Sequence, residues 1–581
     1  MQGFEQDRRV LGDVPVTGRR AGFLRSEDGS LIVFGLFVFL MMAAVAGMAV
    51  DFMRFETQRT RLQSTLDRAI LAASSLDQAL DPEEVVLDYF NKAGLGNFID
   101  ASRVNVYEND RLIDENWAGA SDEELTSRRV EATARMTIGT TFLKFSGIDF
   151  LAAPAAGAAE ESASLTEISL VLDTSGSMSW ASNSGRSKIY ELRQAAKKFV
   201  NIVLCDPAFP DRTSPCVVEE GTVSVSVVPY SEQVLVGETL LSYFNATDEH
   251  DYSSCITFDE ADFEEAAITT TQLLQREGHI DPWSSDDAAG GDDNRTCQTD
   301  SWREITAVSG DASVLRDAID ALGASGNTSI DIGMKWGTAF LDPEARPVVD
   351  DLIDAEETDE LYEGRPLDHD ISRSSKVIVL MTDGVNTDQH YLYDGFRSGA
   401  SPLYRSDHSN NSYVKESIYN AEEDEYYWLF ANNYEDYPMD RPYGEGLVPV
   451  CNRKSDFVRP WRWDNPSKCT WQQGPGATAV DFADLWNEYS WAWWNDWDFL
   501  PSPGNDYGNS TKNARLEDIC TAAKNEGITV FTIGFEVTTA SAVVMKNCAS
   551  SDAHYFDADG LDLSSAFAAI AREINKLRLT N

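Results

Sequence analysis

An aspartate and two serines at alternating positions mark one point of this 581-residue chain where chemistry is expected. Asp173, Ser175 and Ser177 form an Asp-x-Ser-x-Ser motif directly after the apolar stretch 168–172, and the apolar positions of an amphipathic helix begin at Ile189. The apolar stretch predicts a buried strand. Because ligands bind at the carboxyl ends of strands in open α/β sheets, this loop is predicted to face a functional crevice.

Two further oxygen donors stand at similar junctions. Thr328 opens a predicted helix, and Asp383 follows the apolar stretch 377–381. With the first motif they supply hydroxyl and carboxylate oxygens from three loops, a set that suits Mg²⁺ or Mn²⁺. Neutral hydroxyl ligands leave a metal electrophilic, so an open coordination position would favour a carboxylate from another molecule. We therefore predict a recognition site for an acidic group, with a metal held by Asp173, Ser175, Ser177, Thr328 and Asp383.

The same residues have a structural alternative, since an Asp/Ser turn can cap a helix N-terminus without any metal. A hydrolytic role is disfavoured. No H-x-x-x-H, H-E-x-x-H or G-x-S-x-G motif occurs, so neither a general base nor an activated nucleophile is evident. We expect a binding protein and no enzyme, without catalytic or cofactor-binding residues apart from the metal ligands.

Apolar stretches alternate with amphipathic helices around these loops, as in βαβ units. Stretch 377–381 is apolar throughout, which is typical of a strand covered on both faces. Strands are expected at 168–172, 223–228, 377–381, 528–535 and 554–556. The inner face of a closing helix is expected at Leu563, Phe567, Ile570, Ile574 and Leu577. Residues 161–581 are thus predicted to form an α/β, doubly wound (Rossmann-like) sheet with large insertions at about 206–320 and 388–512.

Each predicted insertion has an open interpretation. The acidic run 284–294 in the first is compatible with Ca²⁺, but it lacks the twelve-residue calcium-loop pattern, so a solvated loop is favoured. Residues 388–512 hold nine of the fourteen tryptophans. Such density suits a surface for sugars or a protein partner, but the structural alternative, that these rings form the insertion's own core, is favoured.

The chain is strongly acidic. It has 47 basic and 96 acidic residues, a net charge of −49 and a pI near 4.3. Binding to nucleic acid is disfavoured because neutralising phosphates needs a basic patch. The apolar content of 43% and the aromatic content of 10% support packed cores, so the chain is expected to be folded.

One segment is long and apolar enough to cross a membrane. Residues 31–50 carry no charge, and at 1.5 Å per residue they match a hydrocarbon core of roughly 30 Å. Five arginines precede the run and Asp51 follows it, which predicts a cytoplasmic N-terminus at 1–30. The alternative is a cleaved signal peptide, because small residues stand at 44–46.

Beyond the membrane, apolar residues at three- and four-residue spacing predict an amphipathic stalk helix over 51–80. Asp81 and Pro82 predict the start of another helix, and alternating stretches at 104–107 and 130–136 predict strands. Residues 81–160 are therefore expected to form a small α+β module that ends in a small-residue linker, 152–159.

The eight cysteines all lie beyond the apolar run, which favours an exported, oxidising location. Eight cysteines allow 105 pairings. The simplest expectation joins sequence neighbours, with isolated buried thiols as the alternative. The expected pairs are Cys205 with Cys216, Cys255 with Cys297, Cys451 with Cys469 and Cys520 with Cys548.

Two family resemblances follow from these motifs. The Asp-x-Ser-x-Ser motif, the threonine loop and the M-T-D-G of 381–384 resemble the metal-ion-dependent adhesion site (MIDAS) of von Willebrand factor type A domains, matched at all five positions. Gly29 with the apolar run, 49–51 and the stalk stretch 62–69 resemble the TadE/TadG-like proteins of bacterial tight-adherence (Flp) pilus systems. The closing stretch 574–579 is similar to the end of the TadG type, which adds an exported von Willebrand type A domain.

The resemblance implies a single-pass protein of a bacterial inner membrane with a periplasmic C-terminal region. Its expected role is a metal-dependent adhesion or assembly module that captures an acidic group of a pilus or envelope component. The alternative function is a surface adhesin that binds carbohydrate through the tryptophan-rich insertion.

Overall fold

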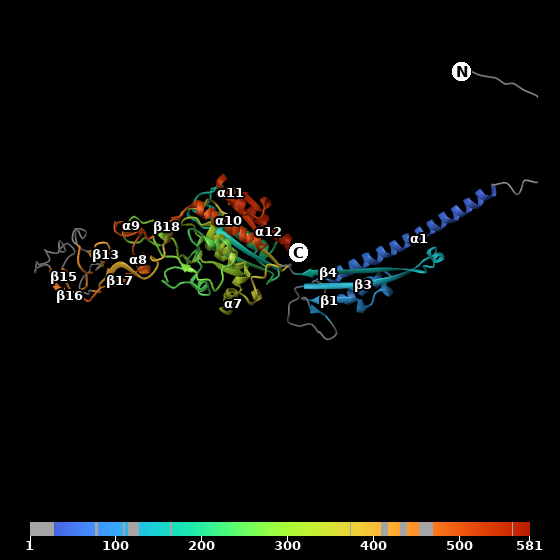
Figure 1. Cartoon of the computed structure of the whole chain (residues 1–581), viewed down its shortest axis with the longest axis horizontal. Coiled ribbons are helices and arrows are strands. Elements are labelled where there is room, and N and C mark those ends of the chain that lie inside the picture. The colour runs from blue at the N-terminus through green and yellow to red at the C-terminus, as the bar shows by residue number, and fades with distance from the viewer. Residues whose placement is uncertain are drawn as a thin grey trace, which may run out of the picture. The chain divides into compact units, whose positions relative to one another are not determined.

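The computed structural model describes residues 28–75, 80–108, 111–113, 127–162, 165–371, 374–407, 416–429, 438–451, 469–560 and 562–580. The chain divides into two compact units, Met1–Ala163 and Ser164–Asn581 (Figure 1). Nearly all of the predicted cytoplasmic segment 1–30 lies outside the described residues.

The first unit begins with the long helix α1 (Asp28–Ala73). Its 46 residues run unbroken from the apolar stretch into the stalk, which confirms the predicted continuous helix, although it ends at Ala73 and not at residue 80. Side chains in the apolar stretch are mostly exposed, whereas Leu62, Leu66 and Ala69 are fully buried. The helix is long and apolar enough to cross a membrane, and its stalk end forms a common core with the rest of the unit.

The stalk packs on a short helix and an antiparallel sheet. Helix α2 (Pro82–Lys92) begins as predicted, because the Asp81 carboxylate accepts hydrogen bonds from the backbone N–H groups of Glu83 and Glu84. The sheet has the order β2-β1-β3-β4. Its strands are β1 (Val104–Glu108), β2 (Arg111–Leu112), β3 (Ser127–Gly139) and β4 (Phe150–Ser162).

The predicted linker 152–159 is wrong, because it forms the middle of β4 and pairs with β3 along its whole length. The run consists of small residues because β4 lies close against α1. A Cβ atom at Gly157 would lie 2.9 Å from Ile70 Cδ1, and Gln63 Nε2 donates a 3.0 Å hydrogen bond to Ala156 O. A strand that faces a helix at close range therefore has the composition of a linker.

The second unit is built on a six-stranded sheet of order β20-β19-β10-β5-β6-β9. Five strands are parallel, and β9 is the antiparallel edge strand. This confirms the doubly wound α/β class. The strands after β5 are added on one side of it up to β9 and on its other side from β10, so the strand order reverses between β5 and β10. The strands are β5 (Leu165–Asp173), β6 (Val223–Tyr230), β9 (Thr306–Ser309), β10 (Ser374–Thr382), β19 (Thr529–Phe535) and β20 (Tyr555–Ala558).

Helices cover both faces of this sheet. Apolar side chains of β5 alternate between the two layers, with Leu170 in one core and Val171 in the other. One layer holds α3 (Lys188–Leu204), α5 (Ala312–Ala321) and α12 (Asp562–Thr580). The other holds α6 (Ile330–Ala339), α10 (Asn509–Asn525) and α11 (Thr539–Cys548). Helix α7 (Arg346–Asp354) follows α6.

The predicted insertion 206–320 is too wide, because β6, β9 and α5 belong to the sheet and its cover. The added chain lies between β6 and β9, at about 231–305. It contains α4 (Glu238–Leu241), β7 (Ile256–Thr257) and β8 (Gln275–Arg276). The strand predicted at 223–228 is β6, whereas β9 and α5 were not predicted within this polar range.

The second insertion leaves the sheet after β10 and returns before α10. Its stem is the pair β11 (Gln389–Leu392) and β18 (Gly504–Tyr507). A sheet of order β14-β13-β12-β17 follows, from β12 (Ala400–Arg405), β13 (Glu416–Asn420), β14 (Glu425–Trp428) and β17 (Thr478–Asp481). The remaining elements are β15 (Leu447–Cys451), β16 (Cys469–Gln473), α8 (Phe482–Glu488) and α9 (Trp491–Asn495).

Most described tryptophans of this insertion serve its own core. Trp486, Trp494 and Trp497 are buried in one apolar cluster, as the structural alternative predicts. Trp471 is 45% exposed. Trp461 and Trp463 lie outside the described residues.

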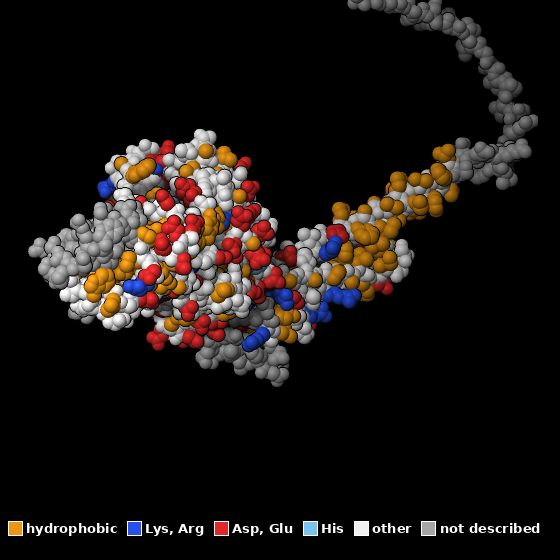
Figure 2. Space-filling view, turned by 60° about the vertical axis from the view of Figure 1, so that its left-hand side comes forward, with side chains coloured by type: hydrophobic (Ala, Val, Ile, Leu, Met, Phe, Trp, Pro, Cys, Tyr) orange, Lys and Arg blue, Asp and Glu red, His pale blue; other side chains and the backbone are white. Residues whose placement is uncertain are grey.

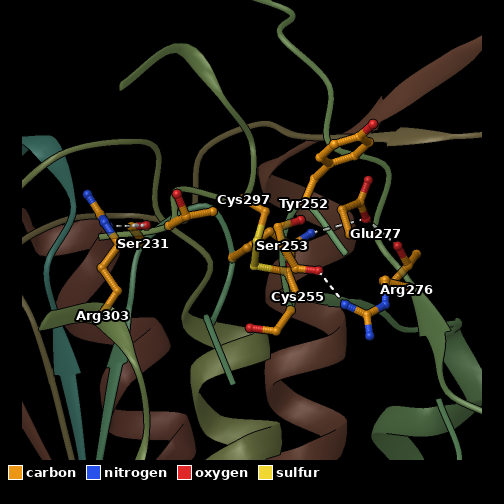
Figure 3. The surroundings of a disulfide bond; sticks show 12 residues. Ser231, Tyr252, Ser253, Cys255, Arg276, Glu277, Cys297 and Arg303 are labelled. Carbon is orange, nitrogen blue, oxygen red and sulfur yellow. Dashed lines mark hydrogen bonds between the residues drawn. A yellow bond between two sulfur atoms is a disulfide. The ribbon is translucent and has the colours of Figure 1, made fainter. Parts of the chain in front are cut away.

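Disulfides confirm three of the predicted cysteine pairs. Cys205–Cys216, Cys255–Cys297 and Cys520–Cys548 are bonded, and Figure 3 shows the second of these among Ser231, Glu277 and Arg303. Cys469 is disulfide-bonded, and its backbone lies opposite Cys451 in the β15–β16 ladder. The Cys451 side chain lies outside the described part of the chain.

Candidate metal site

The predicted site lies where β5 and β10 end side by side. Asp173 is the last residue of β5, and Asp383 follows β10 directly. A third loop joins them through backbone hydrogen bonds, from Ser325 N to Thr174 O at 2.9 Å and from Gly176 N to Gly326 O at 2.8 Å. The three loops therefore converge at the point where the sheet reverses its winding, which is where such sheets bind ligands.

Four of the five predicted residues form one hydrogen-bonded group. Ser177 Oγ donates to Asp383 Oδ1 at 2.6 Å, and the hydroxyls of Ser175 and Ser177 are 3.2 Å apart. Asp173 accepts from Ser175 N through Oδ1 at 2.8 Å and from Thr382 Oγ1 through Oδ2 at 2.7 Å. Ser177 is half-buried and the other three are buried.

Thr328 is held beside this group by its backbone. Thr328 N donates to Thr387 Oγ1 at 2.8 Å, and Thr387 N donates to Thr328 O at 3.0 Å. Lys512 Nζ also donates to Thr328 O at 2.8 Å. Within the described residues the Thr328 hydroxyl makes no hydrogen bond to the other four side chains. The Thr328 loop therefore lies next to the group, but Thr328 itself does not join its hydrogen bonds.

A lysine that sequence reasoning missed completes the site. Lys188 Nζ lies 2.9 Å from Asp383 Oδ2, and both side chains are buried. Lys188 is the first residue of α3, where the helix dipole disfavours a positive charge. That unfavourable position is the signal in the sequence that could have pointed to a partner carboxylate.

The site holds more negative charge than the protein neutralises. Burial, together with the charge of Asp383, raises the pKa of Asp173 to about 7, although hydrogen bonds from Ser175 and Thr382 act in the opposite direction. Lys188 pairs with Asp383, whereas Asp173 accepts from a backbone N–H and a hydroxyl group. This excess of oxygen acceptors fits a hard divalent cation such as Mg²⁺ or Mn²⁺.

The acidic run 284–294 has a different construction. Asp281, just before it, accepts hydrogen bonds from the backbone N–H groups of Trp283, Ser284 and Gly290. Asp292 accepts from Thr299. Among the described residues, no three histidine, cysteine, aspartate or glutamate side chains gather as a metal site. These carboxylates stabilise the loop's own backbone, and Ca²⁺ binding there gains no support.

Several solved structures are similar to this chain at low identity. They include the von Willebrand factor domain of the type V pilus tip protein Mfa5 from Porphyromonas gingivalis, at 14% identity, a TM-score of 0.29, and coverage of 72% of this chain and 97% of that chain. The pilus adhesin SpaC from Lactobacillus rhamnosus GG follows at 12% identity and a TM-score of 0.28, with 82% of this chain matching 35% of that chain.

The third is proximal thread matrix protein 1 from the mussel byssus, whose structure has a zinc-occupied MIDAS motif. It is 11% identical, with a TM-score of 0.23 and coverage of 70% and 46% of the two chains. TM-scores this low carry no argument, so the fold assignment rests on the strand order. No curated protein matches the sequence.

One family matches the N-terminal part directly. Residues 29–76 match the family described as "Putative Flp pilus-assembly TadE/G-like". The match covers the apolar stretch and the stalk, which form one helix up to Ala73. The N-terminal part of this chain, from residue 29 to 76, is thus similar to the TadE/G-like family of Flp pilus-assembly proteins.

Proposed function

We propose that the chain is a membrane-anchored module that captures an acidic group of a pilus or envelope protein through a divalent metal. The observation that carries the proposal is the hydrogen bond between Ser177 and Asp383. It joins two loops that are 206 residues apart in the sequence into one buried set of oxygen ligands. The TadE/G-like match supports the pilus context.

Each site residue has a role in this proposal. The hydroxyls of Ser175, Ser177 and Thr328 would ligate Mg²⁺ or Mn²⁺. Asp173 and Asp383 would hold metal-bound water or orient those hydroxyls, as their hydrogen bonds to Ser175 N and Ser177 Oγ already indicate. When bound, the metal supplies the positive charge that a partner carboxylate needs.

The net charge of −49 also bears on how the proposed metal would act in binding an acidic partner. An acidic protein repels an acidic ligand at long range, although salt screens this repulsion beyond about 10 Å. A divalent cation provides local positive charge at the point of contact. We therefore expect partner binding to increase more steeply with Mg²⁺ than with NaCl of equal ionic strength.

The anchor in this proposal is the apolar half of α1. It crosses the inner membrane once, with residues 1–30 in the cytoplasm and the region beyond Asp51 in the periplasm. The arginines that precede the helix support this orientation. The module binds rather than catalyses, because Asp173, the carboxylate whose pKa is raised to about 7, is fully buried and both of its oxygens accept hydrogen bonds.

Affinity capture from envelope extracts tests the proposal. The bait is the full-length chain in detergent, used with Mg²⁺, with EDTA, and as Asp173→Ala. The matched control is Asp498→Ala, an exposed carboxylate remote from the site in the sequence. A partner that is retained by the control but lost with EDTA and with Asp173→Ala supports the proposal, whereas a partner retained under all conditions contradicts it.

The carbohydrate-binding alternative rests on two exposed rings of the second insertion, Trp471 and Tyr393, which are 45% and 42% exposed. A deletion that separates the two functions must spare Lys512, because this residue holds the Thr328 loop. Replacing 393–503 with a two-residue Asn-Gly turn keeps the β11–β18 stem. Loss of glycan adhesion with partner capture intact would favour the alternative.

A further inference from the structure

The turn between β3 and β4 lies against the end of the apolar stretch of α1 (Figure 1). A Cβ atom at Gly47 would lie 2.3 Å from Phe142 Cδ1, so the Phe142 ring packs directly on the helix backbone. The Asp51 carboxylate accepts hydrogen bonds from the backbone N–H groups of Thr141, Phe142 and Leu143, at 2.6–3.1 Å. The hairpin tip is thereby fixed at the level of residues 47–51.

Contacts along the hairpin show that it follows α1 toward the membrane end. Gly157 lies against Ile70, Ala156 O accepts from Gln63, and Thr141 Oγ1 accepts from Arg54 at 3.3 Å. The residues of α1 that the hairpin contacts therefore run from 70 back to 54 as the hairpin approaches its tip. The turn of the hairpin therefore lies beside the last residues of the apolar stretch.

The tip presents apolar side chains that the described part of the first unit leaves partly or largely exposed. Phe145 is 89% exposed and Phe150 is 66% exposed, while Ile148 and Phe142 are 43% and 40% exposed. In Figure 2 the orange side chains of α1 lead into further orange side chains where the helix joins the rest of the unit. A patch of this kind is typical of a membrane or protein contact.

The backbone of the tip is suited to a place without water. Thr140 N donates to Asp149 O, Phe145 N to Phe142 O, Gly147 N to Lys144 O and Ile148 N to Leu143 O, at 3.0–3.2 Å. The Asp51 carboxylate accepts hydrogen bonds from the N–H groups of residues 141–143. Membranes tolerate backbone only where its polar groups are paired, and this turn meets that condition at these positions.

We propose that the β3–β4 tip, residues 142–150, inserts into the lipid bilayer at the interface where α1 leaves it. The inference rests on the proposed membrane crossing of residues 31–50. Gly47 lies three residues inside the end of that stretch, about 4.5 Å at 1.5 Å per residue. Phe142, which packs on Gly47, is therefore level with acyl chains, and the exposed charged groups of Lys144 and Asp149, 3.9 Å apart, reach the lipid headgroups.

Continuity with the apolar stretch identifies lipid as the occupant. The phenylalanines and the exposed face of α1 form one surface, and a bilayer that surrounds the helix also meets the tip. The hairpin then fixes the tilt of the first unit, because the unit is held at the helix and at a second point.

Depth measurements test this proposal in the full-length chain, reconstituted in phosphatidylcholine nanodiscs with spin-labelled lipid. A single cysteine with an environment-sensitive fluorophore is placed at Phe145→Cys, Leu40→Cys or Glu160→Cys. Leu40 reports on the helix, and Glu160 lies at the far end of β4, about 33 Å from Phe150 along the strand. No described native cysteine is free to react with the label.

We expect several-fold stronger quenching at positions 145 and 40 than at position 160. Quenching at 40 but not at 145 would overturn the inference and leave the membrane anchor intact. No quenching at 40 would contradict the membrane crossing itself. Phe150→Glu in the chain labelled at 145 should reduce quenching there and leave quenching at 40 unchanged; equal quenching at 145 with and without Phe150→Glu would count against lipid contact of the tip.

Discussion

Lys188 and Asp383 form a buried ion pair, with Nζ 2.9 Å from Oδ2, at the site proposed to bind a divalent metal. The lysine occupies one oxygen of the carboxylate, and Ser177 occupies the other. An ammonium group and a divalent metal therefore compete for the same buried negative charge. The competition sets how strongly the site attracts a metal.

Replacing Lys188 with methionine tests this competition. Without metal, the variant leaves Asp383 buried and unpaired, so the free energy of unfolding should fall by about 3 kcal/mol. The affinity for Mn²⁺ should rise by about tenfold, because a neighbouring positive charge is removed, and tenfold corresponds to about 1.4 kcal/mol. Denaturant unfolding in EDTA and titration calorimetry with Mn²⁺ measure the two effects.

Lys197→Met is the matched control, since Lys197 pairs with Asp320, a carboxylate that is 59% exposed. Such a pair contributes little, and neither quantity should change by more than about 1 kcal/mol. A Lys188→Met variant that loses Mn²⁺ affinity would show instead that the lysine positions Asp383 for the metal.

Lys512 gives a second prediction about the site. Its buried ammonium group donates to Thr328 O and Thr387 O at 2.8 Å each, and to Ser329 Oγ. Lys512→Met removes three charged hydrogen bonds from the threonine loop, so Mn²⁺ affinity should fall by about tenfold or more. Lys524→Met is the control, because this lysine donates to a single acceptor, Asn547 O, among the described residues. Equal Mn²⁺ affinities of both variants would mean that Thr328 is not a ligand or needs no support.

The two lysines also show what sequence alone could not supply. The grouping of Asp173 with Asp383 was predictable, because adjacent parallel strands end at the same edge of a sheet. Lys512 reaches Thr328 only because the second insertion returns its chain to the start of α10. No local pattern encodes that return, and nothing in the composition distinguishes Lys512 from a surface lysine.

Some strands could be predicted from the sequence and others could not. The stretch 377–381 was recognisable because a strand buried on both faces needs apolar residues throughout. The stretch 152–159 was not, because the small side chains that let β4 approach α1 are also those of a flexible linker. A partner surface decides between the two structures, and the sequence pattern does not contain the partner.

Trp180 provides a test of partner binding that does not depend on metal affinity. The side chain is 66% exposed, and its backbone N–H donates to Ser177 O at 2.9 Å, so this residue closes the turn that carries Ser177. Exposed tryptophans beside a binding site commonly act as anchors. Trp180→Ala should weaken partner capture by about tenfold and leave Mn²⁺ affinity unchanged. Trp283→Ala, an exposed ring of the first insertion, is the control, and equal losses from both variants would argue against a specific role.

Glu277 predicts how stability depends on pH. Burial, and to a smaller extent the charge of Glu232, raises the pKa of Glu277 to about 7, against the opposing effects of Thr257 and Arg397. In the unfolded chain the same carboxyl has a pKa near 4.5. The folded protein therefore keeps a proton that the unfolded chain has already lost, and folding becomes less favourable as the pH rises from about 4.5 to 7.

Glu277→Gln removes this dependence, because glutamine keeps the shape of the protonated side chain. Between these pH values the free energy of unfolding of the wild type should fall by about 3 kcal/mol relative to the variant. Denaturant unfolding in EDTA at several pH values measures the difference, and EDTA removes any contribution of a bound metal. Gln233 and Thr257 donate hydrogen bonds to the Glu277 carboxyl. Glu249→Gln, at a carboxylate whose pKa is lowered, is the control with the opposite slope. Parallel pH curves for the wild type and Glu277→Gln would show that Glu277 is already ionised throughout this range.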